Sequence, residues 1–191
     1  MPKRLFGFLP QDFQQLLWFL TLVFAVASGF LLHVFAFSPF QEFCVEGVIT
    51  PVFSPGADKV IVPLVDAATK TIDVELYQFS FSGLKGALAR AVERGVRVRV
   101  VLEPRVSSNY ATAEFLSENG VLVKWASREF SNTHSKFAVF DSEKVLVGSI
   151  NWSRHAMKFN REAAILLQEV EIAESFKEVF EQDWSDASFT R

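Results

Sequence analysis

Two short segments near the middle of the chain carry side chains that could act on a phosphodiester. The first, T-H-S-K-F-A-V-F-D, contains His134, Lys136 and Asp141, and the second, G-S-I-N, contains Ser149 and Asn151. Successive side chains of a strand point to opposite faces, so residues two apart share a face. We therefore expect His134 to project with Lys136, and Ser149 to project with Asn151.

These four side chains suit a phosphoryl group if the two segments pair as neighbouring strands. Lysine and asparagine can neutralise or hydrogen-bond the non-bridging oxygens, while histidine can attack phosphorus or protonate a leaving oxygen. Glu162, at the start of a later strand pattern, could orient an imidazole through its ring N–H. An H-x-K sequence by itself is more often a polar pair on an exposed strand. The spacing of the whole set favours a site.

The order and spacing of these motifs resemble the phospholipase D superfamily. H-S-K-x4-D followed by G-S-I-N is similar to that family's H-x-K-x4-D and G-S-x-N signature, and the similarity extends over about residues 48–184. The resemblance implies that His134 is a nucleophile that forms a phosphohistidine and that a second histidine is the general acid. It also implies that the phosphoryl group is bound by Lys136, Ser149 and Asn151, and that Glu162 holds the imidazole.

The same resemblance bears on cofactors and on the motif's aspartate. It implies a reaction without a metal or any other cofactor, and the sequence shows no carboxylate or Cys/His cluster of metal-ligand type. Asp141 is counted among the site residues in a supporting role, because it falls at a predicted strand end where it can pair with nearby donors.

The chain carries one copy of the motif, although many members of the family carry two. His155 does not begin a second copy, because Met157 stands where the lysine would be. In-line displacement places the nucleophile and the leaving group on opposite sides of phosphorus, so one imidazole cannot serve both. We therefore expect a two-fold homodimer in which two copies of His134 share one site, as in small single-motif members of the family.

Alternating strand and helix patterns predict one α/β domain over residues 45–191. Short links between the early elements predict a largely parallel sheet covered by helices, and the link at residues 141–144 predicts an antiparallel hairpin. The expected fold is therefore a phospholipase D-like mixed sheet flanked by helices. We expect strands at 47–53, 71–79, 96–102, 121–125, 135–140, 145–150 and 162–168, and helices at 58–70, 83–94, 112–119 and 169–184.

Residues 16–40 contain no Asp, Glu, Lys or Arg. About 20 apolar residues suffice to cross a hydrocarbon core about 30 Å thick. We therefore predict a single transmembrane helix at about residues 16–37, within an N-terminal anchor of residues 1–44. A cleaved signal peptide is the alternative, but the apolar run exceeds the usual ~7–15 residues of such a segment.

The flanking charges predict the orientation of this anchor. Lys3 and Arg4 precede the span and the next basic residue is Lys59, so we expect a cytoplasmic N-terminus and a catalytic domain on the outer side of the membrane. His33 lies near the far end of the span, where an uncharged imidazole can reach the interface. Cys44 is expected to be a free thiol.

The charge is unevenly distributed over the chain. The net charge is −3, but residues 85–161 carry 13 basic and 7 acidic side chains. This basic middle favours an endonuclease on DNA or RNA, and the alternative is a membrane-anchored phospholipase D that hydrolyses or transfers phosphatidyl groups. An inactive tethered scaffold is disfavoured by the intact motifs. The groove for a nucleic acid would be supplied by Arg97, Arg99, Arg105, Lys124, Arg128, Arg154, Lys158 and Arg161.

Overall fold

The computed structural model describes residues 18–26 and 47–189, in two separate units, Met1–Cys44 and Val45–Arg191. In the first unit, residues 18–26 are helical, and Trp18 and Phe24 are 78% and 75% exposed. No helix among the described residues has both the length and the hydropathy to cross a membrane. The rest of the predicted span, with His33, Cys44 and the basic pair before it, lies outside the described residues.

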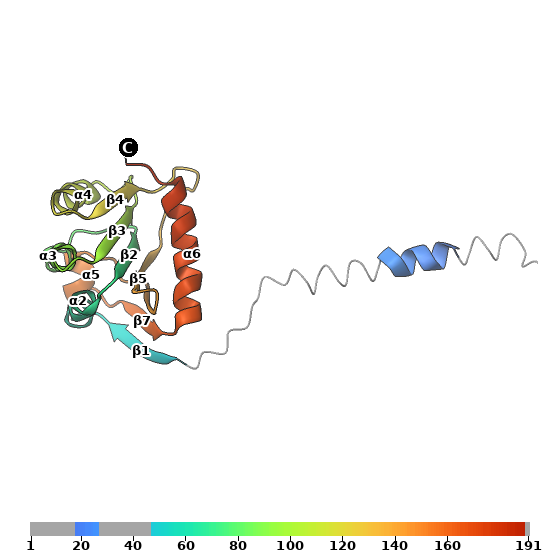
Figure 1. Ribbon diagram of the computed structural model, residues 1–191, viewed down its shortest axis with the longest axis horizontal. Helices are drawn as coiled ribbons and strands as arrows, with labels where there is room; N and C mark the ends of the chain where they lie inside the picture. The colour runs from blue at the N-terminus through green and yellow to red at the C-terminus, as the bar shows by residue number, and fades with distance from the viewer. Residues whose placement is uncertain (1–17, 27–46, 190–191) are drawn as a thin grey trace, which may run out of the picture. The chain divides into compact units, whose positions relative to one another are not determined.

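The second unit is built on one seven-stranded mixed sheet (Figure 1). The strand order is β1-β7-β6-β5-β2-β3-β4. β2, β3 and β4 pair in parallel, whereas β1, β7, β6, β5 and β2 pair antiparallel. The predicted mixed sheet and the β5–β6 hairpin are thereby confirmed. The strands are β1 Val48–Phe53, β2 Thr71–Leu76, β3 Arg97–Leu102, β4 Leu122–Trp125, β5 Lys136–Phe140, β6 Lys144–Gly148 and β7 Ala163–Gln168.

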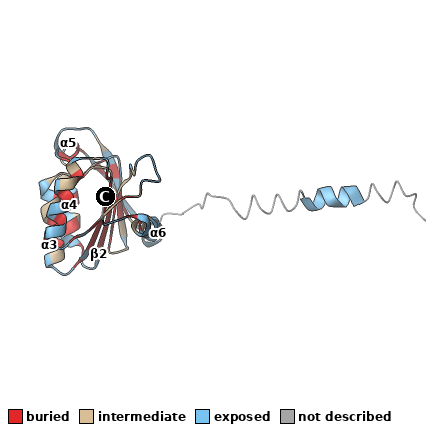
Figure 2. Cartoon of the chain, turned by 90° about the horizontal axis from the view of Figure 1, so that it is seen from above, coloured by how far each residue is buried: buried red, intermediate tan, exposed pale blue. Residues whose placement is uncertain are grey.

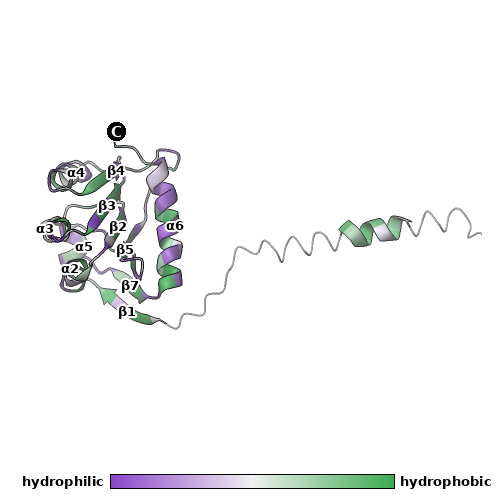
Figure 3. Ribbon diagram, viewed as in Figure 1, coloured by the Kyte–Doolittle hydropathy of each residue, from purple (hydrophilic) through white to green (hydrophobic). Residues whose placement is uncertain are grey.

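Helices cover both faces of this sheet (Figures 1 and 2). Helices α2 (Asp58–Ala67), α3 (Ser82–Glu93), α4 (Ser108–Glu118) and α5 (Arg154–Lys158) lie on one face, and α6 (Val170–Asp186) lies on the other. Figure 3 shows hydrophilic and hydrophobic residues alternating along α6. Because strand side chains alternate between faces, the sheet supports two separate cores. Val74 and Leu76 belong to the core under α2–α5, and Phe137 and Val139 to the core under α6.

The start of α2 agrees with the predicted start at residue 58. The helix begins at Asp58 and contains Pro63 in its interior. Proline has no N–H to donate to the carbonyl of Lys59, four residues earlier. Both residues are exposed, so water can satisfy that carbonyl and the helix tolerates the proline.

Two other helices begin earlier than predicted. Helix α3 begins at Ser82, one residue before the predicted start; Phe81 occupies the cap position, and no side chain bonds the free N–H groups there. Helix α4 begins at Ser108, four residues before the predicted start. Its early turn contains the buried Asn109, a poor helix former that is kept in place by tertiary hydrogen bonds.

Candidate active site

A pocket of about 860 Å³ opens where β5 begins and β6 ends. His134 precedes β5 and Lys136 is its first residue, while Ser149 and Asn151 follow β6 instead of lying within it. The Ser149 N–H donates to the carbonyl of Ala163 on β7 at 2.9 Å, which extends the sheet pairing by one step. The structure therefore brings the predicted residues together around one pocket, at its polar end: His134, Lys136, Ser149, Asn151 and Glu162.

His134 is exposed and lies between an aromatic ring and an ammonium group. Its ring centroid is 4.4 Å from that of Tyr77. Lys136 Nζ lies 3.1 Å from His134 Nδ1 and also donates to the His134 carbonyl. Because an ammonium group only donates, Nδ1 is the acceptor in this contact and the proton of a neutral imidazole lies on Nε2. Burial lowers the pKa of Lys136, although the charge of Glu162 acts in the opposite direction.

Glu162 bonds a hydroxyl and an amide instead of the imidazole. Ser149 Oγ donates to Glu162 Oε2 at 2.5 Å, and Asn160 Nδ2 donates to Oε1 at 3.0 Å. Within the described part of the chain, no hydrogen bond joins Glu162 to His134. The Oδ1 atom of Asn151 is buried without a hydrogen-bond partner among the described residues, so its amide is not committed to this network.

Asp141 lies outside the pocket, at the turn between β5 and β6. Its carboxylate accepts hydrogen bonds from the N–H groups of Thr69, Lys70 and Thr71, at 2.7–3.2 Å. Burial acts to raise the pKa of Asp141, but these backbone bonds hold it below its usual value. The side chain therefore ties the hairpin turn to the start of β2 and has no contact with the polar end.

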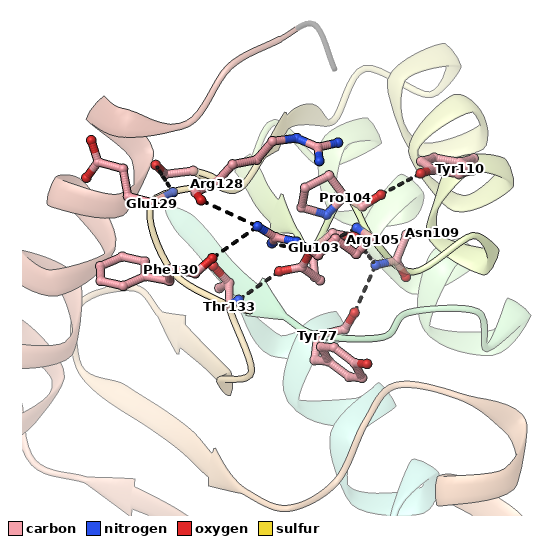
Figure 4. Close-up of polar contacts among 11 residues, drawn as sticks. Tyr77, Glu103, Pro104, Arg105, Asn109, Tyr110, Arg128, Glu129, Phe130 and Thr133 are labelled. Carbon is pink, nitrogen blue, oxygen red and sulfur yellow. Dashed lines mark hydrogen bonds and ion pairs between the residues drawn. The ribbon is translucent and has the colours of Figure 1, made fainter.

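The segment that leads into the motif is held by a buried carboxylate that sequence analysis missed (Figure 4). Glu103, just after β3, accepts a hydrogen bond from the Thr133 N–H at 2.7 Å and from Arg105 Nη1 at 2.9 Å. Arg105 Nη2 donates in turn to the carbonyls of Arg128 and Phe130. Burial acts to raise the pKa of Glu103, but these bonds hold it below its usual value. In the sequence, the one indication of this network was a glutamate directly after an apolar strand.

The same network reaches the ring that packs on His134. The amide of Asn109 donates to the carbonyls of Tyr77 and Glu103, at 2.9 and 3.0 Å (Figure 4). Thr133 and Tyr77 are therefore both anchored to the end of β3. These two residues flank His134, one in sequence and one in space, so the network fixes the position of the imidazole.

None of the eight basic residues predicted to form a groove lines this pocket. Arg99 is buried on the α6 face, where it pairs with Asp73 at 2.7 Å and Glu181 at 2.6 Å. Lys158 forms an ion pair with Asp58. Arg99 and Lys158 therefore have carboxylate partners and do not support the predicted groove, whereas a groove formed by the other members stays a prediction. The remaining members outside the pocket are Arg97, Arg105, Lys124, Arg128, Arg154 and Arg161.

The other side of the pocket is an apolar wall formed by Phe137, Val147, Phe176 and Val179. Phe176 and Val179 come from α6, and the ring of Phe176 packs against that of Phe137 at 5.3 Å. Val179 is 50% exposed. The pocket therefore joins a polar end that can hold a phosphoryl group to a wall that offers no hydrogen bonds. Among residues 18–26 and 47–189, no group of three His, Cys, Asp or Glu could hold a metal ion.

Curated proteins similar to this chain include mitochondrial cardiolipin hydrolases. The mouse protein, from Mus musculus, is 30% identical over 126 residues, which are 65% of this chain and 57% of that protein. The Xenopus tropicalis protein is 28% identical over 78% of this chain and 75% of its own length. A phospholipase D of Rickettsia conorii is 29% identical over 67% of this chain and 65% of that protein. The chain spans about half the length of the first curated relatives it matches.

Solved structures and a family model agree with these similarities. A phospholipase D family member from Salmonella typhimurium, Nuc, superposes with a TM-score of 0.70 and 26% identity, over 74% of this chain and 97% of that one. NucT from Helicobacter pylori shares the fold, with a TM-score of 0.69 and 16% identity, over 75% of this chain and 99% of that one. The family model described as "Cardiolipin synthase, PLD-like domain" matches residues 61–184. With the motif residues gathered in one pocket of this fold, the chain belongs to the phospholipase D superfamily.

Proposed function

We propose that the protein is a phosphodiesterase that works through a histidine-bound intermediate and needs no metal ion. The observation that carries this proposal is the convergence of His134, Lys136 and Asn151 on one pocket. Lys136 and Asn151 would hold the non-bridging oxygens, where charge develops in the transition state. A nitrogen of His134 would attack phosphorus, and the bond from phosphorus to the leaving oxygen would break. Water would then hydrolyse the phosphohistidine and release the imidazole.

Substrate binding would also change the protonation of His134. In the structure, the Lys136 ammonium donates to the lone pair of Nδ1, so the proton of a neutral imidazole lies on Nε2. The nitrogen that could attack, Nδ1, is therefore blocked by Lys136. A phosphoryl group would draw the Lys136 ammonium to itself and release Nδ1. The imidazole would then carry its proton on Nδ1 and attack with Nε2. A proton on Nδ1 is what a carboxylate must accept to orient the ring, the role that the family resemblance implies for Glu162.

A homodimer would supply the general acid. The pocket of one chain holds one imidazole, since His155 lies on α5 beside the ring of Phe159 and does not line the pocket. The leaving oxygen needs a proton from the side opposite the attacking nitrogen. We propose that a second copy of His134, brought by a two-fold partner, donates that proton.

The substrate that suits this pocket best is a phospholipid. The polar residues and the apolar wall line the same pocket, so a phosphodiester with apolar substituents would contact both. The similar cardiolipin hydrolases and phospholipase D point to the same class of compound. A nucleic acid, which the sequence favoured, is the alternative outcome of the test, because the eight basic residues of the predicted groove do not line this pocket.

The test compares the two substrate classes without free metal. Full-length protein in EDTA is given vesicles of phosphatidylcholine with cardiolipin, single-stranded DNA, or RNA. We expect phosphatidate release, diversion to phosphatidylethanol when ethanol is added, and a covalent adduct on His134 by mass spectrometry. His134→Ala should form no adduct, whereas His155→Ala should still form it. Cleavage of nucleic acid alone would select the alternative, and activity restored by one divalent ion would overturn the mechanism.

The N-terminal segment is proposed to hold this site at a membrane, with the N-terminus cytoplasmic and the catalytic domain outside. The helix at residues 18–26 exposes large apolar side chains, a surface that lipid would cover. Replacing both Leu22 and Phe24 with Arg should release the full chain from alkali-washed membranes, because each central arginine costs about 2.5–3.5 kcal/mol. Retention of this variant would contradict the anchor.

A further inference from the structure

Ser135 stands between the two motif residues, and its side chain is bonded to a buried carboxyl group on β2. Ser135 Oγ donates a hydrogen bond to Glu75 Oε1. Glu75 is 2% exposed and lies opposite Phe137 in the β2–β5 register. The backbone reinforces this link, because the Tyr77 N–H donates to the Ser135 carbonyl at 3.0 Å. Glu75 and Ser135 both line the active pocket.

The second oxygen of Glu75 faces another acid. Oε2 is buried and has no hydrogen-bond donor among the described residues, and Asp183 of α6 lies near enough to raise the pKa of Glu75 through its charge and a side-chain contact. Two ionised carboxylates can only accept, so these two side chains can bond to each other only by sharing a proton. Burial raises the pKa of Glu75 to about 8; the bond from Ser135 opposes this shift, and Asp183 adds to it.

No nearby base neutralises this pair. Among the described residues, no lysine, arginine or histidine forms an ion pair with Glu75 or Asp183. Ionisable groups nearby have other partners. Arg99 pairs with Asp73 and Glu181, and Glu103 pairs with Arg105. Lys124 donates to the carbonyl of Trp184, and Lys177 donates to the hydroxyl of Ser142. His134 and Lys136 belong to the segment that Glu75 holds and are bonded to each other. The proton is therefore the one counter-charge available to the pair.

We propose that Glu75 is a positioning residue, which holds the H-S-K segment through Ser135 for as long as Glu75 and Asp183 share a proton. Loss of that proton places two negative charges side by side, one buried on β2 and one half-buried on α6, and drives α6 away from β5. The displacement reaches both sides of the pocket, since Ser135 adjoins His134 and Lys136 while α6 carries Phe176. The activity readout of this proposal rests on the proposed function.

The first experiment measures kcat and KM of the full-length protein on bis(4-nitrophenyl) phosphate from pH 5.5 to 9.5. At pH 7, Glu75→Ala and Ser135→Ala should each lower kcat about tenfold with little change in KM, because misplaced catalytic groups slow the chemical step. Glu75→Gln should restore most of this loss, since its amide accepts from Ser135 and donates to Asp183.

The pH profile separates positioning from general structural support. Wild-type kcat should fall above about pH 8, and Glu75→Gln should lose the part of that fall due to Glu75. Deprotonation of Lys136, whose pKa is also lowered, would appear equally in both proteins and so cancels in the comparison. If kcat falls identically above about pH 8 in the wild type and in Glu75→Gln, the proposal is overturned.

The second experiment needs no activity. A carboxyl group whose pKa rises on folding binds more protons in the folded state, so it makes stability fall as pH rises from 4.5 to about 8. Thermal unfolding of Glu75→Gln should lack this slope. Glu181→Gln is the matched control, because it removes a carboxylate of the same helix that pairs with Arg99, and it should keep the slope. An unchanged slope in Glu75→Gln overturns the proposal, whereas a lost slope in a protein inactive on every phosphodiester supports it and rejects the proposed function.

Discussion

The polar end and the apolar wall of the pocket are built from different kinds of structure. The polar end consists of side chains at the ends of neighbouring strands, where sheet pairing fixes the backbone on either side. Its loop is also tied down by the buried Glu103. The apolar wall depends on α6, and Val179 there is half exposed. On the proposed function, the polar end would carry out the reaction and the apolar wall would select which phosphodiester is accepted.

The largest effect is expected from substitutions at the polar end. Lys136→Ala or Asn151→Ala removes a group that would hold a non-bridging oxygen, and one such donor is typically worth about 10²–10³ in rate. The loss should be similar on phospholipid vesicles and on a small soluble diester, because both carry the same phosphoryl group.

A matched control for Lys136 is Lys70→Ala, which removes an exposed lysine paired with Glu143 outside the pocket. It should retain wild-type turnover. Near-normal turnover of Lys136→Ala or Asn151→Ala, measured with folding confirmed by circular dichroism, would contradict the proposed site.

The next effect concerns the rigidity of the polar end. Glu103→Ala leaves the Thr133 N–H without its acceptor, and a buried donor left unpaired costs about 1–3 kcal/mol. Arg105 loses its bond to Glu103 but is exposed and keeps its bonds to the carbonyls of Arg128 and Phe130. Urea unfolding should show this loss of stability, and kcat should fall because Thr133 precedes the nucleophile. Glu103→Gln keeps an acceptor and should lose less. Equal stability of the wild type and Glu103→Ala would show that the network does not hold the loop.

The polar end could be predicted from sequence because most of its residues are close together in the chain. The period of a strand pairs His134 with Lys136, and one hairpin brings Asn151 alongside. The carboxylates behind it could not be predicted, since a glutamate in an apolar strand gives no indication of its partner. Glu103 meets a loop 30 residues away, and Glu75 meets a carboxyl group on the last helix.

The apolar wall could not be predicted either, because it depends on contacts between elements far apart in the sequence. An amphipathic pattern predicts that α6 packs on the sheet, but not that it alone covers one face. That placement depends on which face α2 to α5 already occupy. Arg99 does not contribute to the predicted basic groove, because it points toward α6, where Asp73 and Glu181 neutralise it. Charge counts along the sequence cannot distinguish a guanidinium exposed to substrate from one buried in an ion pair.

A smaller and more selective effect is expected at the apolar wall. Phe176→Ala should lower kcat/KM on phospholipid vesicles about tenfold, the effect of losing roughly 1.4 kcal/mol of apolar contact. The loss on a small soluble diester should be clearly less. Phe159→Ala is a matched control, because Phe159 is 57% exposed and lies outside the pocket. Equal losses on both substrates would mean that the wall only supports the fold.

The smallest effect tests whether the polar end is complete within one chain. Each chain brings one imidazole to its pocket, and the reaction needs one bonded to phosphorus while another protonates the leaving oxygen. A mixed dimer of wild type and His134→Ala would hold one imidazole where two are required, and would be inactive. If chains pair at random, active dimers scale as the square of the wild-type fraction, so an equal mixture retains about a quarter of the activity. Independent sites would retain about half. A linear mixing curve, with subunit exchange verified by a tag, would show that each chain carries its own acid, and His155→Ala would then be the first variant to examine.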